Sequence, residues 1–539
     1  MDPTLTLGAA SAILAAAALA AGVIARGPVS FPLLFLGLGL LLGPGGVDVV
    51  AIDLGAPLLT IVAVTTLSLV LFLDAVKLDV DGLRRDWWVP ALTLGPGTLL
   101  TIALVTAAAA VLFGWNWPVA LIAGAALAST DAVTLRDTLR DQRLPFSLRR
   151  SLAVEAGTND LIVLPVLLAA IAIATRQATG PLGWAWFVVQ LLVIGPAAGA
   201  AVGLGGARLM AWVDGRTDVP REHQSIYGVA LVLVAFVAGE LVGGSGFLAA
   251  FAAGLAVSVA NTTLCDCVLD LGQVTAEVLL LAAFVLFGIV LSGELVGLSA
   301  LPTLAFGAIV LFVARPLAVG GVLALAPTSL SARAIGLMAW SGPRGLASLL
   351  LALLAVQADV PGAQPVFAAV GGVVALSVLL HGTTSTPLAG LYARREAGEV
   401  RPEDRAISAT DALRHLPTED VPRISIEELL IAQDRDPAPV VVDVRTEVAR
   451  HVRPRTIPGS VWVPPEDAER WLEEELPRMP NGTATPLVLW CTCKGEATAA
   501  QVAAAARRRG VDAVALRGGL SAWERSGQPV ADLTLATPG

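Results

Sequence analysis

Two carboxylates lie within apolar stretches of the chain. Asp131 is part of the segment STDAV at residues 129–133, and Asp160 closes the segment EAGTND at residues 155–160. The surrounding runs of Leu, Ala, Val and Ile are long enough to span a bilayer. A carboxylate at membrane depth costs a few kcal/mol at least, so it seldom occurs there without a use. With the neighbouring Thr and Asn, the two carboxylates form an oxygen-rich set that suits hard monovalent cations and protons, which indicates an ion-coupled transporter.

The composition is that of a membrane protein with a soluble tail. Apolar residues make up 55% of the chain and charged residues 15%, whereas soluble proteins have roughly 25% charged residues. Apolar blocks alternate with short polar loops up to about Tyr392, and from Arg394 onward the sequence resembles a soluble domain. The net charge is −9 and no basic patch stands out, so no nucleic-acid partner is expected.

The cysteines and the first apolar block indicate whether the protein is secreted. The four cysteines form two Cys-x-Cys pairs, at 265/267 and 491/493, which is no secreted disulfide framework. The apolar block at residues 5–25 lacks a basic leader and a clear small-residue cleavage site. We therefore interpret it as a retained first helix and not as a signal peptide.

Hydropathy and charge predict the number and direction of the membrane spans. At about 20 residues per span, the sequence offers about thirteen helices. Their centres lie near Ala15, Leu36, Thr65, Leu100, Gly124, Val163, Val193, Val234, Gly254, Val285, Val310, Leu349 and Val374. With the N-terminus outside, the outer loops hold only Arg176, and all other loop Lys and Arg residues lie inside. The sequence thus predicts a multi-pass protein of the cell (inner) membrane with a cytoplasmic tail.

The residues next to the carboxylates predict a helix break and an ion site. Ser129 and Thr130 can loosen a helix by competing for its carbonyls, and unwound backbone within the membrane is where transporters coordinate ions. Glu155 and Asn159 are four residues apart and share a helix face. Asp160 lies about ten residues, roughly 15 Å, beyond the arginines that mark the inner mouth. The alternative is that these carboxylates lie at a helix end and reach water.

Two arginines also occur within apolar blocks, at Arg315 and Arg344. An arginine at this depth stays charged and needs a partner. Glu155 is the natural partner for Arg315, and this pairing would leave Asp160 to titrate. Arg344, in the segment SGPRG at 341–345, is either a buried functional residue or a loop residue at a helix kink.

In chain order, these motifs resemble the NhaP-type sodium/proton antiporters of the monovalent cation:proton antiporter family. The motifs are Thr-Asp, Glu-x-x-x-Asn-Asp, Arg-Pro, Gly-Pro-Arg-Gly and the closing LHGTTSTPL at residues 380–388. The resemblance runs from about residue 5 to 392. It implies a thirteen-helix fold of two inverted repeats, with a dimerisation domain, a core domain of crossed, broken helices, and a homodimer.

The resemblance also implies roles for single residues. It assigns Asp131 and Asp160 to the cation site, Thr130 to a carbonyl ligand and Asn159 to holding the broken helices. It assigns Glu155 and Arg315 to a structural ion pair. The chain departs from the family in two places: Ala156 stands where a Ser hydroxyl often contacts the ion, and Thr-Asp-Ala-Val replaces Thr-Asp-Pro-Val. Thr158 or water would have to supply the missing ligand.

Competition at one carboxylate predicts the mechanism. Asp160 cannot hold a proton and a cation at once, so a site that opens alternately to each side couples the two gradients. The single Asn-Asp pair resembles the electroneutral branch, one H⁺ for one Na⁺, with K⁺ or Li⁺ as alternatives. The sequence has no ATP-binding Gly-rich loop, so we expect secondary transport without a cofactor. The alternative is a cation channel or a transport-dead sensor whose tail is an active sulfurtransferase.

After a linker at 393–424, residues 425–532 predict a small α/β domain, followed by a tail at 533–539. Strands alternate with helices, which favours a parallel sheet. Cys491 lies between a strand and a helix, where backbone N–H groups and the helix dipole favour a thiolate; the alternative is a buried structural cysteine.

The order Asp-Val-Arg, Pro-Gly, strand-Cys-loop and Arg-Gly-Gly-x-x-x-Trp resembles a rhodanese domain. This resemblance implies that Cys491 is the persulfide-carrying catalytic position. Glu496 stands where the family has an Arg, which would disfavour an anionic donor such as thiosulfate, although Lys494 could compensate in part. The domain is therefore either a weak sulfurtransferase or a thiol-based regulatory domain, in which Cys493 could cap an oxidised Cys491.

Overall fold

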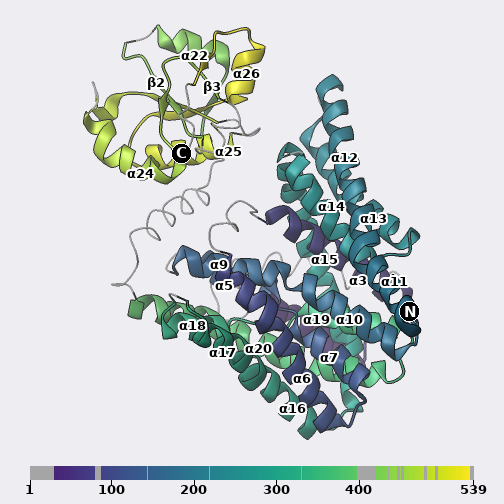
Figure 1. Ribbon diagram of the computed structural model, residues 1–539. Helices are drawn as coiled ribbons and strands as arrows, with labels where there is room; N and C mark the ends of the chain where they lie inside the picture. Colours follow the sequence, from purple (N-terminus) through teal and green to yellow (C-terminus); the bar gives the residue numbers. More distant parts are fainter. Residues whose placement is uncertain are drawn as a thin grey trace. The chain divides into compact units, whose positions relative to one another are not determined.

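The computed structural model describes residues 30–533 except 79–86, 142–143, 218, 261, 329, 397–420, 435, 446–449, 451–453, 479–481 and 492–495. The chain divides into two compact units, one made of the residues up to Arg395 without Pro145–Ser147, the other of those from Glu396 onward with that short segment. The first is a bundle of helices and the second, coloured yellow-green, is an α/β domain (Figure 1).

The first unit is entirely helical in its described part. Its elements are α2 Phe31–Leu42, α3 Pro57–Lys77, α5 Trp88–Leu92, η1 Thr93–Gly97, α6 Thr98–Phe113, α7 Trp117–Ala128, α8 Ala132–Arg140, α9 Phe146–Thr158, α10 Asp160–Ala174, α11 Gly180–Val189, η2 Gln190–Ile194, α12 Gly195–Thr217, α13 Arg221–Leu241, α14 Gly246–Ala260, α15 Thr262–Val296, α16 Ala300–Ile309, η3 Val310–Ala314, η4 Pro316–Gly320, α17 Gly321–Leu325, α18 Ala332–Trp340, α19 Leu346–Gln357 and α20 Ala363–Glu396.

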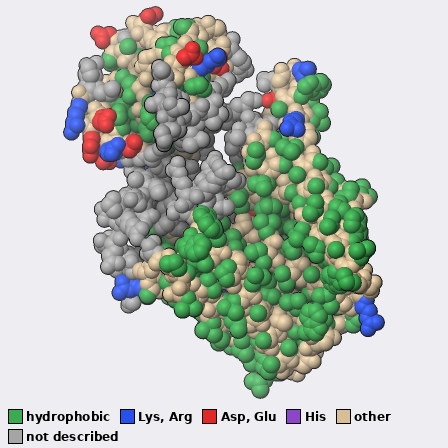
Figure 2. Space-filling view, viewed as in Figure 1, with side chains coloured by type: hydrophobic (Ala, Val, Ile, Leu, Met, Phe, Trp, Pro, Cys, Tyr) green, Lys and Arg blue, Asp and Glu red, His purple; other side chains and the backbone are tan. Residues whose placement is uncertain are grey.

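Nine helices of the described chain are long and apolar enough to cross a membrane, and three shorter apolar helices accompany them, at Phe31–Leu42, Gly246–Ala260 and Leu346–Gln357. A helix lies at every predicted centre from Leu36 to Val374. The predicted first helix, near Ala15, lies outside the described residues, so the total of about thirteen stays a prediction. Large apolar side chains such as Leu182 and Leu325 are exposed, and hydrophobic side chains cover the visible face of this unit (Figure 2).

Two helix breaks face each other in the first unit. The first, at residues 129–131, separates α7 from α8, and the second, at residues 341–345, separates α18 from α19. The main-chain amide of Asp131 donates to the Pro343 carbonyl at 2.9 Å, so the two breaks are in contact. The predicted fold class, a multi-pass bundle of apolar helices, is confirmed, and two of its segments are broken helices in contact.

The second unit contains a five-stranded parallel sheet, as predicted. Its strand order is β1-β6-β5-β2-β4, and β3 and β7 form a separate antiparallel pair. The strands are β1 Arg423–Ile424, β2 Val440–Asp443, β3 Arg455–Thr456, β4 Val461–Trp462, β5 Leu487–Trp490, β6 Ala513–Leu516 and β7 Ala531–Asp532. The helices are α22 Ile426–Gln433, α24 Ala468–Arg470, α25 Ala497–Arg508 and α26 Gly519–Arg525, and short 3₁₀ and π turns occupy Pro465–Asp467, Trp471–Glu475, Leu476–Arg478 and Gly482–Ala484.

Two apolar cores form on the opposite faces of this sheet. Leu487 and Leu489 of β5 belong to the core that contains α25, whereas Val488 and Trp490 belong to the core that contains α22 and α26. This division follows from the alternation of side chains along a strand. The unit therefore has a hydrophobic interior of its own.

Candidate functional site

Asp131 is held by the start of the helix that follows it. It is the N-cap of α8: its Oδ1 accepts from the Val133 amide at 3.2 Å, and its Oδ2 accepts from Thr134 Oγ1 at 2.6 Å. The side chain is buried. An N-cap carboxylate satisfies helix N–H groups that would otherwise lack a partner. Both oxygens of Asp131 are therefore fixed in position at the break.

Asp160 is more open. It is the first residue of α10 and is half-buried. Its Oδ1 accepts from Ser129 Oγ at 2.7 Å, and its Oδ2 accepts no hydrogen bond from any residue in the described ranges. The N-terminus of a helix favours a negative charge. Asp160 therefore presents one carboxylate oxygen for a proton or a cation.

The carbonyls freed by the first break are partly occupied. Arg344 Nη1 donates to the carbonyls of Ala128 and Ser129, both at 2.9 Å, and Asn159 Nδ2 donates to Ala128 at 3.2 Å. The next carbonyl, that of Thr130, accepts no hydrogen bond from the residues that the structure describes. Asn159 thus joins α10 to the end of α7, and the Thr130 carbonyl is left open to a ligand.

Glu155 and Arg315 form a buried ion pair, with 2.7 Å between Arg315 Nη2 and Glu155 Oε1. Arg315 Nη2 also donates to the carbonyls of Ser341 at 3.0 Å and Met338 at 3.3 Å. The pair therefore ties α9 to the second break. No hydrogen bond or ion pair among the described residues links it to Asp160.

For several residues of the site, the role in the structure differs from the one that the sequence predicted. Ser129 was expected only to loosen the helix, yet it donates to Asp160. Arg344 lies in the loop at the second helix break, as the alternative had it, yet it is fully buried and donates to the first break. Thr158, expected as a replacement ligand, donates instead to the Val154 carbonyl of its own helix at 2.5 Å.

A third carboxylate, Asp74 of α3, belongs to the same region. Its Cγ lies 3.8 Å from the place where a Cβ on Gly157 would be, and its charge interacts with those of Asp131 and Asp160. Its closeness to Lys77 makes Asp74 look like a helix-end residue in the sequence. Asp74 comes to the site because helices that are distant in the sequence pack together in the fold.

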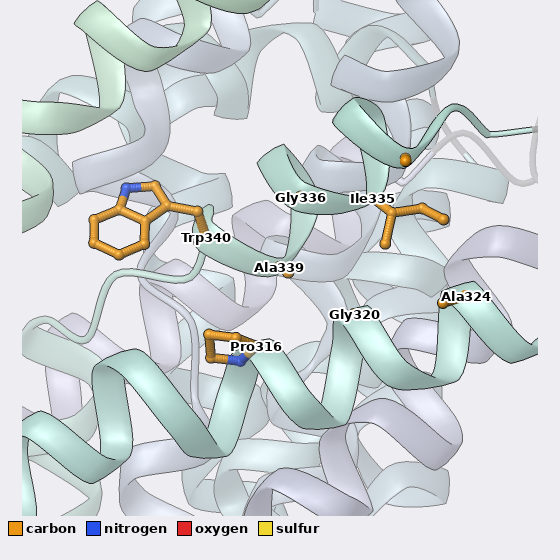
Figure 3. Close-up of a pocket in the computed structure, with 8 residues that line it drawn as sticks. Pro316, Gly320, Ala324, Ile335, Gly336, Ala339 and Trp340 are labelled. Atoms are coloured by element: carbon orange, nitrogen blue, oxygen red, sulfur yellow. The ribbon is translucent and has the colours of Figure 1, made fainter.

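The two cavities found in the described chain lie elsewhere. One, of about 450 Å³, is an apolar groove between η4–α17 and α18, lined by small residues such as Gly320 and Gly336 with Trp340 at one end (Figure 3). The other, of about 430 Å³, is lined by Glu240, Gln190 and Gln357 among apolar side chains. Asp131 and Asp160 are not among the residues that line these two cavities.

In the second unit, Cys491 directly follows β5. Its side chain is 3% exposed and its sulfur is in a disulfide bond, so in this form it is not a free thiolate. Cys493 and Lys494 lie outside the described residues. Before Cys491 could attack a sulfur donor as a thiolate, its disulfide would have to be reduced.

Glu496 faces inward. It is the N-cap of α25 with a left-handed backbone (φ 52°), its Oε1 accepts from the Gly518 amide at 2.6 Å, and its Oε2 lies 3.3 Å from Arg423 Nε. The expectation that its charge repels an anionic donor is thus weakened, because the charge is paired within the domain. Glu496 instead connects the end of the cysteine loop to β1 and to the turn before α26.

A second buried charge cluster fixes the end of β2. Asp443 Oδ2 lies 2.7 Å from Arg445 Nη2 and 3.5 Å from Arg450 Nε. The Arg445 guanidinium lies over the Trp490 ring, 4.5 Å from its centre. Burial lowers the pKa of Arg450, and the Asp443 carboxylate opposes this shift. These contacts are structural: they hold β2 and β5 together beside Cys491.

Two family profiles match the chain. The family described as "Sodium/hydrogen exchanger, transmembrane" matches residues 6–390, and "Rhodanese-like domain" matches residues 425–526. The first match covers more than half of the chain and contains every membrane-site residue discussed above.

Individual proteins agree with the first profile. A K(+)/H(+) antiporter NhaP2 of Shewanella oneidensis is 29% identical over 67% of this chain and 62% of its own length. A K(+)/H(+) antiporter NhaP of Alkalimonas amylolytica is 25% identical over 66% of this chain and 61% of its own length. The chain thus spans about three fifths of the length of these relatives.

A solved structure has the same fold. The sodium proton antiporter MjNhaP1 from Methanocaldococcus jannaschii matches with a TM-score of 0.60 and 19% identity, over 74% of this chain and 100% of that one. At this identity the match speaks for the fold of the membrane unit alone.

Proposed function

The chain belongs to the sodium/hydrogen exchanger family, and from this premise we propose that it exchanges a monovalent cation for H⁺ across a membrane. One observation carries the proposal. Beside the contact between two helix breaks, Asp160 presents a carboxylate oxygen without a hydrogen bond from the described residues, and Thr130, which follows the Ser129 that donates to Asp160, has an open carbonyl. Such a site can take either a dehydrated cation or a proton.

Competition for Asp160 couples the two ions. A cation needs the ionised carboxylate, and a proton on the same oxygen removes the charge that binds the cation. Asp131 contributes negative charge from a fixed position, and Asn159 keeps α10 against the end of α7. If the junction moves between the two sides only when it is occupied, one ion crosses in each direction in turn.

The cation is Na⁺ or K⁺. The motifs indicate Na⁺, whereas the two bacterial relatives are named K⁺/H⁺ antiporters. Na⁺ holds its water more strongly than K⁺, so the dehydration that binding to protein oxygens requires costs more for Na⁺. Li⁺, which holds water still more strongly, is expected to be the weakest substrate.

We propose electroneutral exchange of one cation for one H⁺, because a single Asn-Asp pair supplies one titrating carboxylate. We also propose a homodimer in the inner membrane, with the N-terminus outside and the tail in the cytoplasm; the bias of Lys and Arg toward the inner loops supports this orientation.

The tail is proposed to regulate transport through the redox state of Cys491. The sulfur is buried and disulfide-bonded, which suits a two-state redox element better than continuous turnover. The alternative is a sulfurtransferase, and the pairing of Glu496 with Arg423 keeps it open because that charge no longer faces a donor.

Proteoliposomes test the transport proposal. Vesicles that contain the purified full-length protein and an imposed pH gradient receive Na⁺, K⁺ or Li⁺ in turn, and the pH gradient is followed by fluorescence. Exchange predicts loss of the gradient with at least one cation, at a rate that an imposed membrane potential does not change. A gradient that persists with all three cations would reject exchange and favour the sensor.

A further inference from the structure

We infer that the Ser129 hydroxyl is a cation ligand that replaces the serine missing at position 156, and that it sets the affinity of the site. This inference rests on the proposed function. Ser129 is the C-cap of α7 and is fully buried. Its Oγ lies 2.7 Å from Asp160 Oδ1, and its carbonyl is held by Arg344 Nη1 at 2.9 Å. The hydroxyl is thus held at the carboxylate and the main chain at Arg344.

A serine hydroxyl in this position can bind a cation without giving up its hydrogen bond. It has one proton and two lone pairs, and the proton is used toward Asp160. Both lone pairs then remain for a cation held by that carboxylate. The open carbonyl of Thr130 follows directly in the chain, so residues 129 and 130 supply a hydroxyl and a carbonyl oxygen at one break.

The rival hydroxyl points elsewhere. Thr158 donates to the Val154 carbonyl one turn back in its own helix, at 2.5 Å. Ala156 is four residues before Asp160 and therefore lies on the same face one turn earlier. A serine there would belong to α9, whereas in this chain the hydroxyl that bonds to Asp160 comes from the end of α7.

Moving the serine from position 129 to position 156 tests the inference directly. Cation binding to the purified full-length protein is measured as the rise in melting temperature during titration with KCl or NaCl against choline chloride, because a ligand that binds only the folded state stabilises it. The variants are Ser129→Ala, Ala156→Ser and the double variant. Ser258→Ala is the matched control, since among the described residues that hydroxyl bonds to the Leu255 carbonyl of its own helix and to nothing else.

Ser129→Ala should raise the half-saturating cation concentration by roughly tenfold, the scale of one lost polar ligand. In the double variant, Ala156→Ser should restore the half-saturating cation concentration to near the wild-type value. Introduced alone, Ala156→Ser should lower that concentration below the wild-type value. Ser258→Ala should leave it unchanged. The KM for the cation in proteoliposomes should follow the same order.

An unchanged half-saturation in Ser129→Ala, or a double variant no better than the single one, would overturn the inference while wild-type exchange still supported the proposed function. If Ser129→Ala does not fold, the single variant Ala156→Ser provides the test. An unchanged half-saturating cation concentration in Ala156→Ser would then also overturn the inference. A wild-type protein that neither binds nor exchanges any cation would reject both proposals.

Discussion

The main-chain amide of Asp131 donates a 2.9 Å hydrogen bond to the carbonyl oxygen of Pro343. Each residue lies in one of the two helix breaks, so this bond joins the breaks through their backbones. The carboxylate of Asp131 is fixed at the same time by Val133 and Thr134. Asp131 therefore cannot shift without moving the second break, and a change at one break will be felt at the other.

Gly345→Ala should abolish exchange. A Cβ at this position would lie 2.1 Å from Asp131 Oδ2 and 2.7 Å from its Cβ, so the carboxylate would have to leave its partners. Gly336→Ala in α18 is the matched control, because nothing lies within 4 Å of its added Cβ. Initial rates of pH-gradient loss in proteoliposomes check this. Equal rates in the two variants would show that the position of Asp131 is not critical.

Asp160→Asn should fold but fail to dissipate the pH gradient. The amide is nearly isosteric and can still accept from Ser129, but it neither releases a proton nor balances the charge of a cation. Asp131→Asn should be similarly impaired. The control is Asp359→Asn, an exposed loop residue with φ 52°, a conformation that Asn tolerates. Wild-type exchange by Asp160→Asn would remove the site assignment.

Much of the membrane fold followed from apolar length and from the cost of burying charge. Runs of about 20 apolar residues predicted the helices, and the conflict between Ser129, Thr130 and a regular helix predicted the first break. Opposite charges in apolar surroundings predicted the contact of Glu155 with Arg315, and the two side chains do meet at 2.7 Å.

The contacts between distant segments could not be predicted in the same way. Ser129 has nothing in its local sequence that directs it to Asp160, and Asp74 resembles an ordinary residue near a helix end. Arg344 binds carbonyls of Ala128 and Ser129, which are far away in the chain. Sequence periodicity predicts the helix face on which a residue lies, but not the other helix against which that face packs. The inward turn of Glu496 likewise depends on Arg423 and Gly518, which only the folded sheet brings near.

Removing either partner of the Glu155–Arg315 pair should destabilise the protein by roughly 3–5 kcal/mol, because the remaining charge is buried without its partner. Arg315→Met should be the worse variant, since Arg315 also donates to Met338 and Ser341. The charge-swapped double variant should recover stability only in part, because Glu cannot donate to those carbonyls. Melting temperatures in detergent check this. Normal stability of both single variants would show that the pair contributes little.

In the tail, Glu496→Ala should lower the free energy of unfolding by roughly 1–3 kcal/mol, because the Gly518 amide would lose its acceptor within the domain. Glu474→Ala, at an exposed position, is the control. Urea unfolding of the isolated tail, about residues 421–533, provides the measurement, since this unit has its own apolar cores. Equal stability of the two variants would show that Glu496 is not a structural link.

Reduction of Cys491 should change the exchange rate of the full-length protein if the tail regulates transport. The sulfur is buried and disulfide-bonded, and reduction breaks that bond and leaves a buried thiol at the end of β5. Proteoliposomes are assayed before and after treatment with a membrane-impermeant phosphine reductant on the side of the tail. The wild-type rate should shift, whereas Cys491→Ser, which cannot form the disulfide, should give one rate under both conditions.

The isolated tail provides the complementary measurement, because regulation and catalysis predict different behaviour of the same thiol. A regulatory thiol should be alkylated only after reduction and should produce little thiocyanate from thiosulfate and cyanide. Brisk thiocyanate production, together with an exchange rate that ignores the reductant, would assign the tail to sulfur transfer instead. The distinction depends on Cys491, because the same sulfur, at the end of β5, is the redox element in one case and the sulfur carrier in the other.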